Sequence, residues 1–553
     1  MKEINYGGTC RETAKNHTGE VKKMTREETI KAVRDGQVYL GIELGSTRIK
    51  TVVMTADFAI AAEGSHTWQS TYENGSWTYS MEEVEEGLRA SFADAAANVK
   101  AAYGEELKTA AAMGISAMMH GYLAFDKAGN LLAPFRTWQN TTTGPAAEAL
   151  SALFAFNIPQ RWSIAHLYQA ILNGEEHVGK IAHLTTLAGY VHEKLTGRKV
   201  LGIGDASGMF PIDSKTGTYD AVMADKFDDL VKDKGFGWKL RDILPEVLLA
   251  GEEAGSLTED GAAWLDPSGT FKAGVPCCPP EGDAGTGMAA TNATAVLTGN
   301  VSAGTSVFSM IVLEDMLKNY YPEIDMVTTP DGKPVAMVHC NNCTVELNDW
   351  AGLFGEFAAE AGGDADKAYE IIYKMAEKAD ADCGGIIVCN YSAGEPITGI
   401  TTGFPLTVRE PGSRFSLKNL SRAVLYAAVS TLKLGNDILM NEGVKFSRIT
   451  GHGGFFKNGT FGAQVLAAAL KTPVTLMKNA EVGGPYGCAL LAAYRAVKKE
   501  DESLDDFLAG RVFADTETVR VDDDAEMAQG FDAYIRRFKK VLAAEKTLSD
   551  SAE

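Results

Sequence analysis

The residues best suited to chemistry stand in two short turns that are rich in glycine and hydroxyl side chains. Gly45-Ser46-Thr47 lies between the apolar runs 38–40 and 49–54, and Gly304-Thr305-Ser306 lies between the apolar runs 295–297 and 307–312. Such turns can point backbone N–H groups and hydroxyls at an anion, because no bulky side chain blocks the approach. Either turn alone also fits an ordinary hairpin. Together they could bind one polyphosphate from opposite sides.

The two turns differ from the phosphate loop of a P-loop protein. A P-loop runs from a strand through Gly-x-x-x-x-Gly-Lys-Ser/Thr into a helix, and neither turn carries that lysine. The β-branched residues that follow both turns favour a second strand. Gly304 follows Gly45 by 259 positions (304 minus 45), so the chain is predicted to contain two structurally similar halves.

Two acidic residues stand near these turns. Asp283 lies in the small-residue segment Gly282-Asp283-Ala284-Gly285, and Glu43 lies just ahead of the first turn. Phosphoryl transfer to an alcohol needs a group that accepts the hydroxyl proton, and it needs neutralisation of the phosphate charge. Asp283 could alternatively be the N-cap of the helix predicted from Thr286, and Glu43 could be a surface residue of a strand.

Composition limits the class of protein. A chain of 553 residues exceeds the size of one hydrophobic core and predicts two large domains. A formal charge of -21 argues against nucleic acid or an anionic membrane as partner. Residues 1–37 lack the apolar core of a signal peptide, and no apolar run is long enough for a membrane helix. We expect a cytoplasmic protein that acts on a small molecule, with a homodimer as one option for its assembly.

The chain alternates strand and helix signals, which is typical of an α/β protein. A capping box at Thr25 to Glu28 predicts a short helix that ends near Gly36. The clearest further helices are expected over 81–103, 180–195, 417–439 and the apolar positions 531–542. These signals divide the chain into an N-terminal extension (1–37), a first domain (38–272), a second domain (273–500) and a C-terminal helical tail (501–553).

The order of the motifs resembles the FGGY carbohydrate kinases, a sugar-kinase branch of the actin-like ATPase fold. The resemblance covers roughly residues 38–493 and rests on segments 41–47, 119–121, 138–140, 282–284, 304–306, 391–395, 451–454 and 483–489. It implies two actin-like (ribonuclease H-like) α/β domains with a cleft between them. Sugar would bind mainly to the first domain and ATP mainly to the second, and closure would exclude water.

The resemblance also implies roles for the residues near the two turns. Asp283 matches the catalytic aspartate and would accept the proton. The turns 45–47 and 304–306 would bind the β- and γ-phosphates of ATP through N–H groups and the hydroxyls of Ser46, Thr47, Thr305 and Ser306. Glu43 stands where the family normally has an aspartate that helps to position Mg²⁺, usually through water. Because Glu is one methylene longer, either the metal shifts or the hairpin retreats.

Two further groups of residues match the binding sites of the family. Gly451, Gly453 and Gly454 match the adenosine loop, although His452 interrupts it, and the two phenylalanines that follow could stack on adenine or be buried. Residues that face substrate in xylulokinase-like members match Met119, His120, Trp138, Gln139 and Asn140. His120 and Gln139 could bond sugar hydroxyls, while Trp138 offers a flat apolar face. His120 could instead be structural, and the family often has an acidic residue in place of Asn140.

The predicted function is ATP- and Mg²⁺-dependent phosphorylation of a small sugar, a ketopentose of the xylulose or ribulose type or a related polyol. An alternative on the same fold is a nucleotide-dependent sugar sensor or regulatory binding protein. Retention of Asp283 favours catalysis, whereas Glu43 and the altered adenosine loop leave room for the sensor.

The cysteines predict no disulfide framework and no zinc centre. Cys340 and Cys343 form a Cys-x-x-Cys pair that could be half of a zinc site, but no second pair follows at suitable spacing. Eight cysteines in a chain of this length, two of them adjacent, fit a reducing compartment. We interpret the pair as small core residues.

Overall fold

The computed structural model describes residues 23–477 and 483–551. Within them, a first sheet has five strands in the order β13-β6-β1-β2-β3. Their bounds are β1 Tyr39–Leu44, β2 Arg48–Met54, β3 Ile60–Thr67, β6 Ala112–Ala117 and β13 Glu281–Gly282. Strands β1, β2 and β3 are antiparallel neighbours, and β6 and β13 extend the sheet in parallel with β1.

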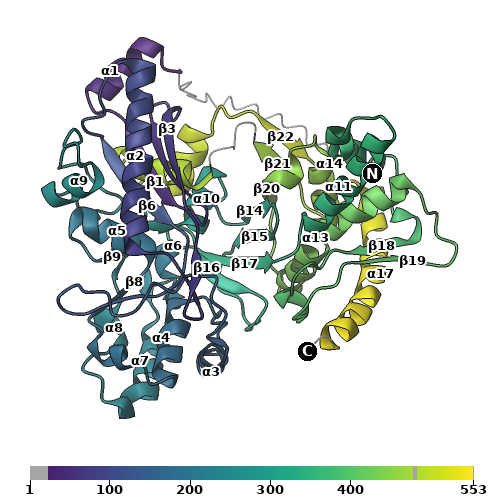
Figure 1. Cartoon of the computed structure of the whole chain (residues 1–553), viewed down its shortest axis with the longest axis horizontal. Coiled ribbons are helices and arrows are strands. Elements are labelled where there is room, and N and C mark those ends of the chain that lie inside the picture. The colour runs from purple at the N-terminus through teal and green to yellow at the C-terminus, as the bar shows by residue number, and fades with distance from the viewer. Residues whose placement is uncertain (1–22, 478–482, 552–553) are drawn as a thin grey trace, which may run out of the picture.

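A second sheet repeats this arrangement in the other half of the molecule (Figure 1). Its order is β16-β17-β15-β14-β20-β21-β22. In its central part β14, β15 and β17 are antiparallel neighbours, while β20 and β21 run parallel to β14. The predicted pair of similar halves is therefore confirmed, with each glycine turn joining the first two strands of its sheet. The bounds are β14 Thr298–Ala303, β15 Val307–Val312, β16 Asp325–Thr328, β17 Pro334–Cys340, β20 Arg448–His452, β21 Val474–Met477 and β22 Thr518–Val521.

Helices cover both faces of the first sheet. Helix α2 (Met81–Tyr103) packs on one face, so closely that a Cβ at Gly64 would lie 2.2 Å from the Ala95 nitrogen. Helix α15 (Gly483–Val497) packs on the other face, where a Cβ at Gly41 would lie 2.1 Å from the Pro485 oxygen. Glycine at these positions lets helix backbone and strand backbone approach.

The first sheet includes residues from beyond the predicted domain boundary at 272/273. Strand β13 pairs with β6, and helix α10 (Asp283–Ala290) follows it directly. The tail predicted over 501–553 is also divided, because Leu504 and Phe507 pack with Tyr39 of the first sheet whereas β22 pairs with β21 in the second sheet. These pairings are between segments far apart in the chain, which composition along the sequence does not reveal.

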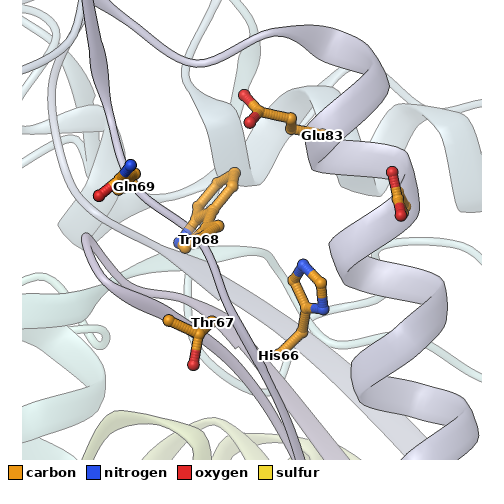
Figure 2. Close-up of a pocket in the computed structure, with 6 residues that line it drawn as sticks. His66, Thr67, Trp68, Gln69 and Glu83 are labelled. Carbon is orange, nitrogen blue, oxygen red and sulfur yellow. The ribbon is translucent and has the colours of Figure 1, made fainter.

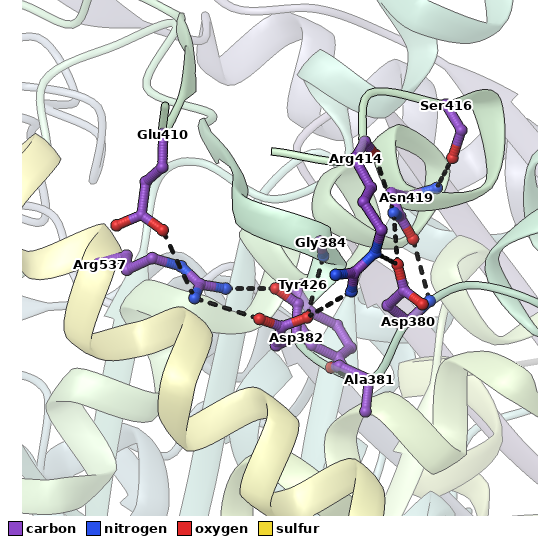
Figure 3. Close-up of polar contacts among 10 residues, drawn as sticks. All are labelled: Asp380, Ala381, Asp382, Gly384, Glu410, Arg414, Ser416, Asn419, Tyr426 and Arg537. Carbon is purple, nitrogen blue, oxygen red and sulfur yellow. Dashed lines mark hydrogen bonds and ion pairs between the residues drawn. The ribbon is translucent and has the colours of Figure 1, made fainter. Parts of the chain in front are cut away.

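The helix predicted from the apolar positions 531–542 is α17 (Ala525–Asp550), and it packs on the second domain. Phe531, Tyr534 and Phe538 are fully buried in its core. Figure 3 shows how charges at its edge add to this contact: Arg537 lies 3.3 Å from the Asp382 carboxylate, which also faces Arg414 at 3.8 Å. The helix is thus an integral part of the domain.

One helix begins later than its composition predicts. The helix expected over 180–195 is α5 (Leu187–Thr196), because His183–Thr185 forms strand β8 and pairs with β7 (Leu123–Phe125). Thr186 then acts as N-cap, its hydroxyl accepting from the Gly189 N–H at 3.2 Å. By contrast α1 (Arg26–Arg34) has the predicted capping box at Thr25.

The remaining elements complete the two domains. The helices are α3 Gly144–Phe154, α4 Ser163–Leu172, α6 Ile203–Ala206, α7 Ala221–Val231, α8 Leu240–Ile243, α9 Glu259–Leu265, α11 Val345–Glu360, α12 Ala368–Ala376, α13 Leu417–Asn441, α14 Phe461–Leu470 and α16 Leu504–Phe507. The strands are β4 Thr71–Glu73, β5 Ser76–Thr78, β9 Val200–Gly202, β10 Ile212–Asp213, β11 Thr218–Tyr219, β12 Glu246–Leu248, β18 Ile386–Cys389 and β19 Leu406–Arg409. Among the described residues, none of the helices combines the length and the apolar character needed to cross a bilayer.

Candidate active site

Asp283 occupies the first position of α10, with Gly282 as the N-cap residue. Its Oδ1 accepts hydrogen bonds from the backbone N–H groups of Ala284 at 3.0 Å and Met119 at 3.3 Å. Its Oδ2 has no hydrogen-bond partner among the residues that the structure describes. Solvent reaches the side chain, yet the surrounding protein raises its pKa to about 6 by desolvation. Asp283 therefore has one carboxylate oxygen fixed by backbone and the other available.

Glu43 lies near Asp283 at the end of β1. Burial, and then the negative charge of Asp283, raise the pKa of Glu43 to about 7, while Lys50 opposes the rise. Lys50 is the direct partner of Glu43 across the β1–β2 pair, so both side chains leave the same face of the sheet. The Glu43 carboxylate fills the space beside Gly484, where Oε1 would be 1.7 Å from a Cβ. The Glu43 side chain, one methylene longer than the aspartate that the resemblance implies, is thus accommodated by Gly484 near the start of α15.

Met119 and His120 follow β6, and the Met119 N–H contacts Asp283. His120 has a φ of 71°, and its Nδ1 lies 3.2 Å from the carbonyl oxygen of Gly208. Because a carbonyl only accepts, Nδ1 carries the proton and Nε2 is an acceptor. Burial and the charge of Arg161 hold the pKa of His120 well below its usual range, so the ring is neutral. A neutral His120 can accept a hydrogen bond from a hydroxyl group through Nε2.

The three predicted sugar-facing residues of segment 138–140 have different surroundings. Trp138 is 39% exposed, and its Nε1 donates to the Ser46 hydroxyl at 3.2 Å. Gln139 has a buried Oε1 without a hydrogen-bond partner among the described residues. Trp138 therefore connects segment 138–140 to the first turn.

Asn140 is buried, and its side chain is fully engaged by protein. Its Oδ1 accepts from the Ser76 hydroxyl and the Trp77 N–H, and its Nδ2 donates to the carbonyls of Trp77 and Thr137, all within 2.8–3.0 Å. These bonds use all four hydrogen-bonding positions of the amide. The structure thus gives Asn140 the role of holding the β4–β5 hairpin, and leaves it no group for a sugar hydroxyl.

The second turn is closed by a bond from the Gly304 N–H to the Ser306 oxygen at 2.9 Å. Its neighbour is the segment that contains the Cys-x-x-Cys pair, because the Cys343 N–H donates to the Thr305 oxygen at 3.0 Å. Cys340 and Cys343 are buried free thiols, in agreement with a core role. Within 23–477 and 483–551 no group of three or more His, Cys, Asp or Glu side chains is arranged to hold a metal ion by itself.

The predicted adenosine loop lies against the second turn. Gly451 pairs with Val301 across β14 and β20, and a Cβ at Gly453 would lie 2.4 Å from the Ala303 oxygen. Gly453 has a φ of 103°, so glycine is required there for both reasons. Phe455 and Phe456 are buried in the core of the domain, which fits packing and leaves neither ring available for adenine.

Comparison with known protein families identifies the family of the chain. The model for the N-terminal domain of the FGGY family of carbohydrate kinases matches residues 38–285, and the model for its C-terminal domain matches residues 299–496. The chain belongs to the FGGY family of carbohydrate kinases. It is therefore an enzyme with the two-domain actin-like fold, and the predicted resemblance is confirmed.

Individual relatives of this FGGY kinase are distant. A xylulose kinase from Haemophilus influenzae is 22% identical over 402 residues, which are 71% of this chain and 77% of the relative. The solved xylulose kinase from Rhodospirillum rubrum has a TM-score of 0.76 at 18% identity, covering 93% of this chain and 100% of that one. A gluconate kinase from Lactobacillus acidophilus also has a TM-score of 0.76, at 16% identity, covering 93% and 99%. The likeness to these structures establishes the fold and leaves the sugar open.

Sequence reasoning missed two buried carboxyl groups behind the catalytic candidate of the FGGY kinase. Glu281 accepts from the N–H groups of Gly204 and Asp205, and Asp205 accepts from the Thr186 hydroxyl at 2.6 Å. Burial raises the pKa of Asp205 to about 7 and that of Glu281 to about 8. The sequence feature that could have indicated Asp205 is its isolated position inside the apolar run 201–210. These groups join α6 to β13 and so support the position of Asp283.

Proposed function

We propose that this FGGY kinase transfers the γ-phosphoryl group of ATP to a hydroxyl of a ketopentose, of the xylulose or ribulose type, or of a related polyol. In this reaction the acceptor oxygen bonds to phosphorus, the bond to the bridging oxygen breaks, and ADP leaves. The acceptor proton passes to Asp283. The xylulose kinase from Haemophilus influenzae supports a ketose as the acceptor.

The observation that carries the proposal is the environment of Asp283. A carboxylate with one oxygen held by two backbone N–H groups and the other without a partner is oriented to receive a proton. His120 follows Met119 in the chain, and its neutral ring can accept a hydrogen bond from a hydroxyl group through Nε2. Gly282 occupies the N-cap position of α10, and Asp283 bonds one helix amide, that of Ala284, and one amide outside the helix, that of Met119.

The residues near the first turn fit Mg²⁺ carried on the phosphates of ATP. Mg²⁺ in kinases is bound through one or two carboxylates and the substrate phosphates, and it keeps several waters. Glu43 is such a carboxylate. Burial and then the negative charge of Asp283 raise its pKa, so a cation held by Glu43 would offset the repulsion between the two groups. When bound, Mg²⁺ neutralises charge on the phosphate oxygens. Lys50 adds a positive charge on the same face.

A substrate panel tests the proposal. The purified chain would be incubated with Mg·ATP and xylulose, ribulose, a pentitol or gluconate, and ADP and phosphorylated sugar would be quantified. We expect ketose-dependent ADP formation. Turnover with gluconate alone would overturn the ketose assignment, and folded protein that binds a sugar without forming product would favour the sensor.

The pH dependence of the reaction should follow the carboxylates of the site. Because Asp283 acts as a base only when deprotonated, kcat/KM should fall as the pH drops through its pKa of about 6. Glu43, with a pKa of about 7, loses its charge over the same range. The decrease in kcat/KM at acid pH therefore reports the titration of Asp283 and Glu43 together. Direct quantification of product between pH 5 and 8 measures this decrease. A flat profile down to pH 5 would contradict it.

Glu43→Gln should weaken the dependence of the enzyme on its metal. The substitution keeps the shape of the side chain and removes its charge, so the Mg²⁺ concentration for half-maximal rate should rise roughly tenfold. Titration of Mg²⁺ at saturating ATP measures the shift. Glu63→Gln on β3 is the matched control, because Glu63 is an exposed residue of the same sheet. Equal Mg²⁺ requirements for the two variants would remove Glu43 from the metal site.

A further inference from the structure

Two aromatic side chains donate hydrogen bonds to the carbonyl groups of the first turn. The Trp68 indole N–H donates to the Gly45 oxygen at 2.6 Å, and the Tyr79 hydroxyl donates to the Ser46 oxygen at 2.6 Å. Both rings are buried, and their centroids are 4.2 Å apart. They form one aromatic pair that contacts two successive peptide groups of the turn.

These two bonds fix the direction of the peptide N–H groups that follow. In a trans peptide the C=O and N–H bonds point to opposite sides. Because the oxygens of Gly45 and Ser46 point toward Trp68 and Tyr79, the N–H groups of Ser46 and Thr47 point away from the aromatic pair. Neither N–H has a hydrogen-bond acceptor in the part of the chain that the structure describes. The turn thus presents two aligned donors, as an anion requires.

A hydrogen bond from Trp138 orients the Ser46 hydroxyl. The Trp138 indole can only donate, so the Ser46 oxygen accepts at 3.2 Å and its own proton is free for another acceptor.

The second turn has the same arrangement with different donors. The Gly304 oxygen accepts from the Thr344 N–H at 3.1 Å and from its hydroxyl at 2.8 Å, and the Thr305 oxygen accepts from the Cys343 N–H. The N–H groups of Thr305 and Ser306 are therefore directed away from the start of α11. In the second domain the carbonyl oxygens of the turn are bound by Cys343 and Thr344, which immediately precede α11, and in the first domain by Trp68 and Tyr79.

We propose that Trp68 and Tyr79 are positioning residues that set the first turn for binding the polyphosphate of ATP. The inference rests on the proposed function, because that function supplies the anion. Both residues act through the turn and touch neither the phosphates nor the sugar. Loss of either hydrogen bond leaves the adjoining peptide free to rotate, so the aligned N–H donors are lost while the fold remains.

The surroundings of Trp68 make the substitution practicable. Figure 2 shows its ring between the strand that carries His66 and Thr67 and the helix that carries Glu83. It borders a cavity of about 460 Å³ at the protein surface. A smaller ring at this position would leave the Gly45 oxygen within reach of water rather than buried without a partner.

The experiment compares Tyr79→Phe and Trp68→Phe with the wild-type chain. Isothermal titration calorimetry with Mg·ATP gives the nucleotide affinity, and thermal unfolding gives the stability. Each variant should bind Mg·ATP roughly five- to tenfold more weakly, the effect of one lost hydrogen bond. The KM for ATP, measured from the rate of ADP formation, should rise by a similar factor.

Two matched variants separate positioning from general stability. Tyr103→Phe removes a hydroxyl bond to the Ala61 oxygen at 3.1 Å, and Trp238→Phe removes an indole bond to the Val178 oxygen at 2.9 Å. Both lie in the first domain and contact neither turn. They should lower the thermal midpoint about as much as the test variants and leave ATP affinity unchanged.

The outcomes are distinct. Equal ATP affinity in Tyr79→Phe and Tyr103→Phe, or equal weakening in all four variants, would overturn the inference alone. A folded wild-type chain that binds no Mg·ATP would overturn the proposed function as well. Where Trp68→Phe does not fold, Tyr79→Phe decides the matter, because it deletes one oxygen and keeps the buried ring.

Discussion

Asp283→Asn is expected to lower kcat roughly a thousandfold, the range that general-base catalysis contributes. Asparagine has the shape of aspartate, and its Oδ1 can still accept from the Met119 and Ala284 N–H groups. It cannot take a proton from the acceptor hydroxyl. Mg·ATP affinity should remain within about twofold of wild type, since a hydrogen-bonding side chain is kept in place. Steady-state kinetics and calorimetry on the same preparation measure the two quantities.

Asp220→Asn is the matched control. Asp220 is a true N-cap, whose Oδ1 accepts from the Met223 N–H at 2.8 Å at the start of α7. Its substitution should change stability slightly and leave kcat unaltered. Near-wild-type turnover in Asp283→Asn, together with a loss of stability like that of a removed cap, would assign Asp283 to capping and remove it from catalysis.

The elements that the sequence predicted correctly depend on neighbouring residues. Each glycine turn is flanked by its own two strands, and the capping box of α1 covers the four residues from Thr25 to Glu28, so short-range preferences determine both. The order of such motifs along the chain was enough to indicate the family, and the two family models confirm it.

Predictions that required long-range pairing were less successful. Strand β13 has two residues and forms only because β6 offers an open edge, so no local signal places Glu281–Gly282 in the first sheet. The start of α5 depends on β8 pairing with β7, which competes with the helical preference of residues 180–186. Composition records helix preference but not the partner that overrides it.

The side chains of the site show the same division. Asp283 is proposed as the catalytic base from its own motif, whereas the contacts of Asn140 involve the hairpin at Ser76 and Trp77, more than sixty positions earlier. The resemblance implies an aspartate at position 43, and the glutamate there lies against Gly484, which is distant in sequence and adjacent in space. An unusual residue in a motif is therefore best interpreted with the partner that accommodates it.

Gly487→Ala is expected to have the second large effect, because α15 and α10 approach each other through this glycine. A Cβ at residue 487 would lie 1.9 Å from the Thr286 oxygen, and that atom belongs to helix backbone and cannot rotate away. Overpacking of this kind costs roughly 1–3 kcal/mol. The helix must shift, and Asp283 lies one turn before Thr286 on α10. Since a small displacement of a catalytic group can cost about a hundredfold in rate, both the free energy of unfolding and kcat should fall.

Gly352→Ala provides the control for this substitution with the opposite expected sign. Gly352 lies on the exposed side of α11, and nothing lies within 4 Å of a Cβ built there. Alanine should stabilise that helix by up to about 1 kcal/mol and leave kcat unchanged. Denaturant unfolding and steady-state kinetics on both variants give the comparison. If Gly487→Ala kept wild-type kcat despite a lower unfolding free energy, the contact between α15 and α10 would stabilise the fold without setting the position of Asp283.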